Sequence, residues 1–351
     1  MAERSQRLSK ILLNNSAPMQ DRFASLFALK MTKDKMSFDS IIECMTKTAV
    51  GTSSLLEHEL AYVLGQMHGI RDQEVKNYET IRSAEFFETS KTALESVLQD
   101  KSRNEVCRHE CGEALAAMLS FDSLEIMENM RDDENEIQCI RETCDLGCER
   151  LYWAKKVISN KTIGIDHNTN PMSSVDPAPP FLDGREKIEK LTESCKVLTN
   201  KSESIWNRYR AMFTLRNQLC SHNIKDDESG FKLKSEIVNS FSEALHCTSS
   251  ALFRHEIGYV LGQILSGGCI DLDLTKILES SLFKSVEVAD EHEMVRHESA
   301  MALGELDTEG SKKLLLNWSG FNECPMLADS CKVALSMVED VEKWSREQFS
   351  I

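Results

Sequence analysis

The sequence predicts an all-α fold built from repeated helical hairpins, and three observations support this. Proline and glycine are scarce, at 6 and 15 of 351 residues. Apolar residues recur at helical spacing throughout the chain, as in amphipathic helices. They make up 41 % of the residues, enough for a substantial core at this length. The length fits two domains or one long array of repeats.

Four runs of sequence repeat one pattern, a His-Glu pair followed by an apolar helix. They are HELAYVLGQM from His58, HECGEALAAM from His109, HEIGYVLGQI from His255 and HESAMALGEL from His297. A second pair of related runs is DRFASLFALK from position 21 and NRYRAMFTLR from position 207. Helical hairpins of this size bury their apolar faces only against neighbours. We therefore predict a HEAT-like α-helical repeat solenoid in two pseudo-symmetric halves.

The two halves are expected at residues 1–160 and 187–351, joined by a Pro-rich linker at 161–186. Four of the six prolines fall within this linker, and proline both fixes φ and removes a backbone donor, which excludes helix there.

The elements around the repeats follow from local pattern. A helix is predicted over residues 37–47 before His58, and another over 182–206 after the linker. The polar run 71–90 is predicted to be an insertion. The acidic run 285–293 is predicted to be a loop, so its own pair, His292 and Glu293, is interpreted as a solvated copy without a helix to aim it.

Composition limits the possible environments and partners. The net charge of −16 makes nucleic acid an improbable partner and suits a cationic one. No run approaches the roughly 18 to 20 apolar residues of a membrane span, and the N-terminus is polar, so no membrane association and a cytoplasmic location are expected. The twelve cysteines are interpreted as reduced, mostly buried thiols.

The repeated His-Glu pair indicates metal binding, because four imidazoles and four carboxylates are costly to bury unless they bind something. Two His and one carboxylate per site suit iron, zinc or manganese. The HExxH motif of zinc proteases is absent at all four places. Two alternatives stay open from the residues alone: a non-catalytic interaction scaffold with a polar repeat consensus, and a two-metal zinc or manganese hydrolase.

The motifs also resemble a known family. HELAYVLGQM, RHECGEAL, RHEIGYVLGQ, RHESAMALGEL, RYRAMF and the linker run SVDPAPP resemble those of deoxyhypusine hydroxylase, a HEAT-like di-iron monooxygenase. The resemblance implies hydroxylation of the deoxyhypusine side chain of translation initiation factor 5A with molecular oxygen, which completes hypusine. It also implies an electron donor, which the sequence does not identify.

The resemblance further implies roles for single residues. His58, His109 and Glu110 would bind one Fe(2+), and His255, His297 and Glu298 the other. Glu59 and Glu256 would hold the cationic substrate amine. The chain departs from the family pattern at Ala116-Ala117, where Leu-Gly is usual, and at Met301, a position that is normally small or acidic.

Overall fold

The computed structural model describes residues 2–48, 51, 53–78, 85–160, 170–172, 174–181, 188–221, 224–225, 227–247 and 250–348. Every regular element among these residues is a helix, which confirms the all-α prediction. The chain divides into two compact units. Unit 1 comprises Met1–His167 and Ser173–Pro179, and unit 2 comprises Asn168–Met172 and Pro180–Ile351. The change between units falls inside the predicted linker, of which residues 161–169, 173 and 182–186 lie outside the described residues.

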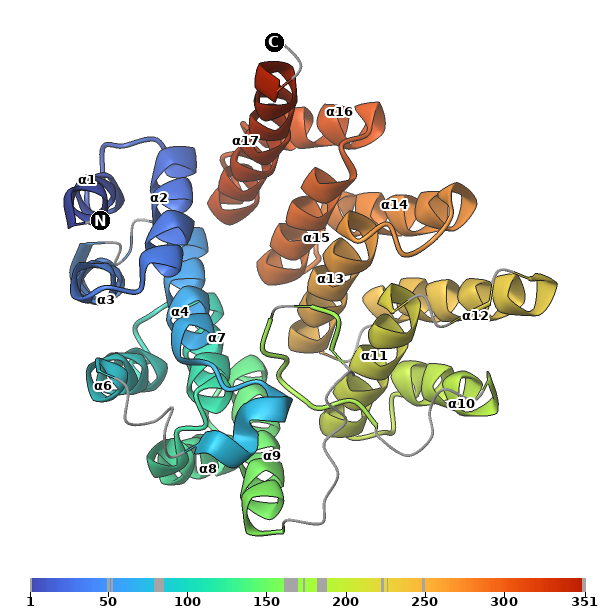
Figure 1. The fold of residues 1–351 in the computed structure, drawn as a ribbon, viewed down its shortest axis with the longest axis horizontal. Helices are drawn as coiled ribbons and strands as arrows, with labels where there is room; N and C mark the ends of the chain where they lie inside the picture. The colour runs from blue at the N-terminus through green and yellow to red at the C-terminus, as the bar shows by residue number, and fades with distance from the viewer. Residues whose placement is uncertain are drawn as a thin grey trace. The chain divides into compact units, whose positions relative to one another are not determined.

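Unit 1 consists of two rows of helices (Figure 1). One row, here called the His-Glu row, contains α2 (Met19–Thr32), α4 (Ser54–His68), α7 (Glu105–Ala117) and α9 (Gln138–Ser159). The covering row contains α1 (Ala2–Leu12), α3 (Lys35–Glu43), α6 (Phe87–Gln99) and α8 (Leu124–Asp132). Short π and 3₁₀ segments span Cys44–Thr48, Asp72–Asn77 and Phe121–Ser123. Each helix packs on its partner in the other row, and consecutive helices of the His-Glu row pack on one another.

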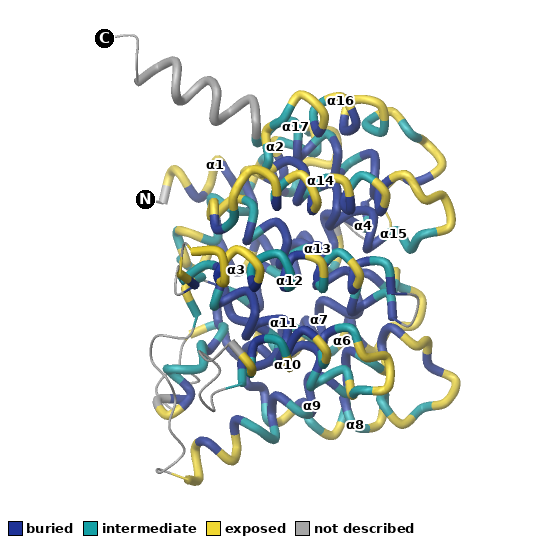
Figure 2. The backbone as a smooth tube through the Cα atoms, turned by 90° about the vertical axis from the view of Figure 1, so that its right-hand side faces the viewer, coloured by how far each residue is buried: buried dark blue, intermediate teal, exposed yellow. Residues whose placement is uncertain are grey.

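Unit 2 repeats this arrangement. Its His-Glu row contains α11 (Ile205–Cys220), α13 (Ala251–Ser266), α15 (Glu293–Leu306) and α17 (Pro325–Gln348). Its covering row contains α10 (Ile188–Thr199), α12 (Glu228–Leu245), α14 (Leu272–Glu287) and α16 (Glu309–Trp318). Figure 2 shows the middle helices of the His-Glu rows in the colour of buried residues. None of the described helices combines the length and apolar character that crossing a bilayer would need.

Several predicted boundaries shift. The helix predicted over 37–47 begins at Lys35 and changes to a π turn at Cys44. The helix predicted over 182–206 spans Ile188–Thr199, and α11 starts separately at Ile205. The prediction of a loop over 285–293 was wrong at both boundaries. Ser285 and Val286 are buried, so α14 continues to Glu287, and α15 begins at Glu293.

A buried arginine links the two rows at four hairpins. Its Nε donates to a backbone carbonyl ten residues earlier, at the end of the preceding covering helix. The bonds run from Arg22 to Leu12 (2.9 Å), Arg108 to Leu98 (2.9 Å), Arg208 to Leu198 (3.0 Å) and Arg296 to Val286 (2.9 Å). The last carbonyls of a helix lack intrahelical donors and carry partial negative charge. The cation therefore satisfies the helix end and fixes where the next helix starts.

Ion pairs join consecutive hairpins, one buried and one half-buried. Arg108 contacts Glu136 at 3.1 and 2.7 Å, and Arg254 contacts Glu291 at 3.1 and 2.6 Å. Each glutamate directly precedes the N-cap of the next helix in the His-Glu row.

In α4 the same position carries Glu57, and the charges are reversed. Arg103, directly before the N-cap of α7, donates to Glu57 at 3.0 and 2.6 Å and to the carbonyl of Met45 at 2.9 Å. The geometry of the coupling is thus kept although its polarity is inverted.

Small residues let the helices of the His-Glu row approach closely. A Cβ on Gly65 of α4 would lie 2.8 Å from the Cα and Cβ of Ala114 on α7. At the equivalent position α7 carries Ala116 instead of glycine, and α9 supplies Gly147, whose added Cβ would lie 3.3 Å from the Ala116 Cβ. The departure at Ala116 is therefore matched by a glycine on the facing helix.

Removal of Arg103 is expected to destabilise unit 1 strongly. Arg103→Ala leaves the Glu57 carboxylate, which is 3 % exposed, without its cation. Breaking such a buried pair costs about 3–5 kcal/mol. Chemical denaturation should show this loss for Arg103→Ala. It should show little change for Lys101→Ala, because the Lys101 ammonium is exposed where it pairs with Asp133 at 2.9 Å and approaches Glu136 at 3.6 Å. Equal losses in the two variants would contradict the assignment.

His68, the last residue of α4, is expected to make stability depend on pH. Its Nε2 lies 3.0 Å from the Ser90 Oγ, and its ring packs against Phe38 and Phe87. Burial, helped by the charge of Lys33, lowers the pKa of His68 to about 4. The unfolded chain therefore binds a proton at this site before the folded chain does. Stability is full above pH 6.5 and is lost as the pH falls towards 4, by up to about 3 kcal/mol.

The measurement is urea denaturation at pH 7 and pH 4.5 for the wild type and for His68→Gln, which keeps a polar partner for Ser90. The difference in unfolding free energy between the two proteins should change with pH in favour of the variant at pH 4.5. Parallel pH profiles for the two proteins would show that His68 does not titrate in this way.

Candidate functional site

The four repeated histidines occupy equivalent places in their helices. His58, His109, His255 and His297 are each the fifth helical residue, five positions after the N-cap. The N-caps Ser53, Asn104, Ser250 and His292 each accept a hydrogen bond from a backbone N–H of the first turn. The His-Glu pair therefore begins the second turn. The sequence pattern had placed the pair at the start of the helix, and the structure corrects this. N-cap side chains satisfy otherwise unpaired donors.

The fifth His-Glu pair has a structural role. His292 is the N-cap of α15, and its Nδ1 accepts from the backbone N–H of Met294 at 3.3 Å. Glu293 is the first residue of that helix. Neither residue reaches the candidate clusters, as predicted, but the half-buried His292 is not simply solvated.

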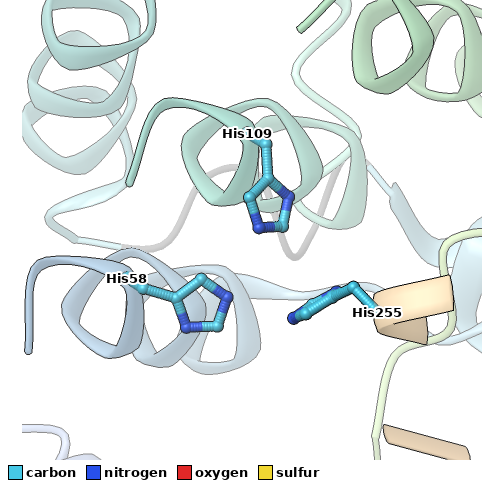
Figure 3. Close-up of side chains that lie close together, drawn as sticks. All are labelled: His58, His109 and His255. Carbon is cyan, nitrogen blue, oxygen red and sulfur yellow. The ribbon is translucent and has the colours of Figure 1, made fainter. Parts of the chain in front are cut away.

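In unit 1, α4 and α7 bring His58, His109 and Glu110 together, all buried. The His58 and His109 ring centroids are 5.3 Å apart, and Figure 3 shows the two rings side by side, with His255 from α13 of unit 2 also labelled. His58 Nε2 lies 3.1 Å from Glu110 Oε2, and His58 Nδ1 lies 3.3 Å from Glu59 Oε1. Both ring nitrogens of His58 thus face carboxylates.

The environment of His58 strongly favours positive charge. Burial by itself lowers the pKa of the imidazole, but the charges and hydrogen bonds of Glu110 and Glu59 outweigh it and raise the pKa well above its ordinary value.

A residue that the sequence reasoning missed, Glu113, also joins the unit 1 cluster. Ligand atoms of His109, Glu110 and Glu113 lie within 4.8 Å of one another, and His109 Nδ1 is 3.8 Å from Glu113 Oε1. Glu113 follows His109 by four residues, so the two share one helix face. That spacing is visible in the sequence. There, however, position 113 served only to show that the second histidine of an HExxH motif is absent.

In unit 2, α13 and α15 bring together all three predicted ligands. One ligand atom each from His255, His297 and Glu298 lie within 4.8 Å of one another. The two rings are nearly parallel, at 24° and 6.3 Å between centroids. His297 Nε2 lies 3.1 Å from Glu298 Oε2. Glu256, the predicted amine-binding carboxylate, is buried beside His255 on α13.

Both ring nitrogens of His297 have close polar neighbours. Nδ1 lies 2.8 Å from the Ser330 Oγ on α17, and that Oγ lies 2.7 Å from the Met326 carbonyl oxygen. Nε2 lies 3.1 Å from Glu298 Oε2. If Ser330 donates its one proton to the carbonyl, it accepts from Nδ1–H, and the Nε2 lone pair is then available to a metal ion beside Glu298.

The donor sets fit transition-metal ions. Each cluster offers two buried imidazoles and a buried carboxylate. The ligand atoms of His255, His297 and Glu298 lie within 4.8 Å of one another, and so do those of His109, Glu110 and Glu113. In the described part of the chain, the metal-competent groups contain only histidine and glutamate. All twelve cysteines are free thiols and eleven are buried. Burial raises the pKa of Cys144 and Cys148 to about 12, which disfavours the thiolate that metal binding requires.

The chain is similar to proteins of one family along nearly all its length. It is 33 % identical to the deoxyhypusine hydroxylase of Phaeosphaeria nodorum over 98 % of this chain and 94 % of that protein. It is 34 % identical to that of Danio rerio over 95 % and 90 %, and 35 % identical to deoxyhypusine hydroxylase-B of Oryza sativa over 93 % and 90 %.

A solved structure shows the same similarity. The fold matches human deoxyhypusine hydroxylase in complex with glycerol, with a TM-score of 0.73, 31 % identity and 96 % of each chain covered. No protein-family model matches the chain.

Proposed function

Because the chain belongs to the deoxyhypusine hydroxylase family, we propose that its two buried His/Glu clusters are the iron sites of a hydroxylating enzyme. Family membership makes the chain a deoxyhypusine hydroxylase and does not favour either alternative, the non-catalytic scaffold or the two-metal hydrolase. The observation that carries the metal assignment is the gathering of His255, His297 and Glu298, which are buried and offer one ligand atom each within 4.8 Å of one another.

Each unit contributes one set of ligands to the proposal. His58, His109 and Glu110 hold one Fe(2+), and His255, His297 and Glu298 hold the other. Bound iron supplies the activation of molecular oxygen, which organic side chains cannot perform alone. The protein's part is to orient the imidazoles, to exclude water and to position the substrate.

Glu59 and Glu256 are proposed to bind the amine of the substrate. Both carboxylates are buried and directly follow a histidine ligand in sequence. The surroundings of Glu59 support the role, because its charge acts on the ammonium of Lys30. Burial lowers the pKa of Lys30, and Glu59 opposes that shift. The Lys30 Nζ also lies 5.2 Å from the ring centroid of Tyr62, a suitable neighbour for a cation.

The protein substrate is proposed to be translation initiation factor 5A in its deoxyhypusine form. The net charge of −16 favours approach of a cationic side chain. The reaction also needs an electron donor from outside the chain, and a cytoplasmic location would bring the enzyme to a translation factor. The direct test is conversion of deoxyhypusine to hypusine in that protein, with and without added ferrous iron.

Ligand variants should lose one iron and all activity. We expect about two irons per wild-type chain, and one in His58→Ala or Glu298→Ala, because each removes a ligand from a different site. Metal analysis of protein purified without chelator measures this. His246→Gln is the matched control, since His246 is bonded to Ser281 outside both clusters. Stoichiometric zinc would favour the hydrolase, absence of metal the scaffold, and wild-type activity in a ligand variant would reject the site.

Variants of the two carboxylates proposed to bind the amine should differ from the ligand variants. Glu59→Gln and Glu256→Gln keep side-chain shape and remove the charge, so both irons should remain bound. The KM for the protein substrate should rise by about 10- to 100-fold, as expected for a lost charged hydrogen bond of about 1.5–3 kcal/mol. Steady-state kinetics combined with metal analysis tests this. An unchanged KM, or loss of iron, would contradict the assigned role.

A further inference from the structure

The Ser330 hydroxyl lies between two polar groups. Its Oγ is 2.7 Å from the carbonyl oxygen of Met326, one turn earlier in α17, and 2.8 Å from His297 Nδ1 on α15. The residue is fully buried, as is His297. A hydroxyl has one proton, so a Ser330 that donates to the carbonyl accepts from the ring.

We propose that Ser330 is a positioning residue for the metal site of unit 2. It holds His297 in the tautomer and orientation that present Nε2 beside Glu298. This inference rests on the proposed function, because it assigns Ser330 a role only if the cluster binds a metal. Partners of the non-ligating nitrogen commonly orient histidine ligands, and their loss weakens metal binding by about 10- to 100-fold.

Unit 1 is built differently at the same places. Thr143 on α9 corresponds to Ser330, since each donates to the carbonyl four residues earlier and each is followed by a buried cysteine. The partner that the structure places near His109 Nδ1 is the carboxylate of Glu113, at 3.8 Å. Four residues after His297, the corresponding residue is Met301, which carries no charge.

The two sites should therefore differ in affinity. Near its ligands, unit 1 has the additional carboxylate of Glu113, which attracts a cation in a buried setting. Unit 2 has the neutral hydroxyl of Ser330 beside His297, and the uncharged Met301 takes the sequence position of Glu113. We infer that unit 1 binds its Fe(2+) more tightly and that unit 2 depends on Ser330 to hold its own.

The test is anaerobic titration of the full-length apo protein with Fe(2+), followed by calorimetry. The wild type should bind two equivalents in two steps of unequal affinity. Ser330→Ala should weaken only the weaker step, by about 10- to 100-fold. Ser330→Thr should restore it, because threonine keeps the hydroxyl and already occupies the corresponding position in unit 1. Met301→Glu should strengthen the weaker step.

Ser194→Ala is the matched control. Ser194 is also fully buried in unit 2 and also donates to a carbonyl one turn earlier, that of Lys190 at 3.0 Å, but on α10. It should leave both binding steps unchanged. Thermal unfolding of the apo proteins should show similar losses for Ser194→Ala and Ser330→Ala, which separates packing from metal positioning.

The outcomes distinguish this inference from the proposed function. Two unchanged steps in Ser330→Ala, or a Ser330→Thr variant as weak as Ser330→Ala, would overturn the role of Ser330 and leave the iron sites standing. Two identical steps in the wild type would overturn the inequality of the sites. A wild type that binds no Fe(2+) would overturn the proposed function itself.

Discussion

The structure depends on burying imidazoles and carboxylates in the contacts between adjacent helices. His58 and Glu110 meet at 3.1 Å across α4 and α7, and His255, His297 and Glu298 gather between α13 and α15. Such groups are tolerated inside a protein only when charge and hydrogen bonding are compensated. A bound cation is the compensation that suits all of them together, so the packing of these helices and the chemistry of the site share one requirement.

The rest of each unit keeps these helices in place. Arginines such as Arg108 attach the start of one helix to the end of the preceding one, and ion pairs attach each hairpin to the next. Because Glu57 and Arg103 reverse the usual polarity without changing the connection, the geometry of the coupling is more important than the sign at either end. Close contacts such as Gly65 against Ala114 then set the helix spacing on which the cluster distances depend.

The two units use one plan but differ around their histidines. Glu113 lies near His109 in unit 1, whereas Ser330 contacts His297 in unit 2, where Met301 takes the sequence position of Glu113. Repeats of one ancestral pattern can therefore keep the same ligand types while changing the groups that orient them. Metal affinity depends on those orienting groups as well as on the ligands. Two sites with equivalent ligands therefore need not have the same affinity.

The sequence by itself determined the helical class, the four equivalent His-Glu positions and the residues that could serve as ligands, because periodicity and repetition are local properties of the chain. It also carried the family resemblance. It missed the N-cap of α15 at His292, because the role of that side chain depends on where α14 ends and α15 begins.

Only the tertiary structure decided which groups surround the ligands. Ser330 lies 33 residues from His297, and no local pattern in either helix indicates their contact. The same hydroxyl lies 2.7 Å from the Met326 carbonyl of its own helix. Glu113 shows the intermediate case, since its helical spacing from His109 was readable but its approach to the cluster required the packed helix. Side-chain environments arise from packing between segments distant in sequence, and that is the reason the sequence alone could not supply them.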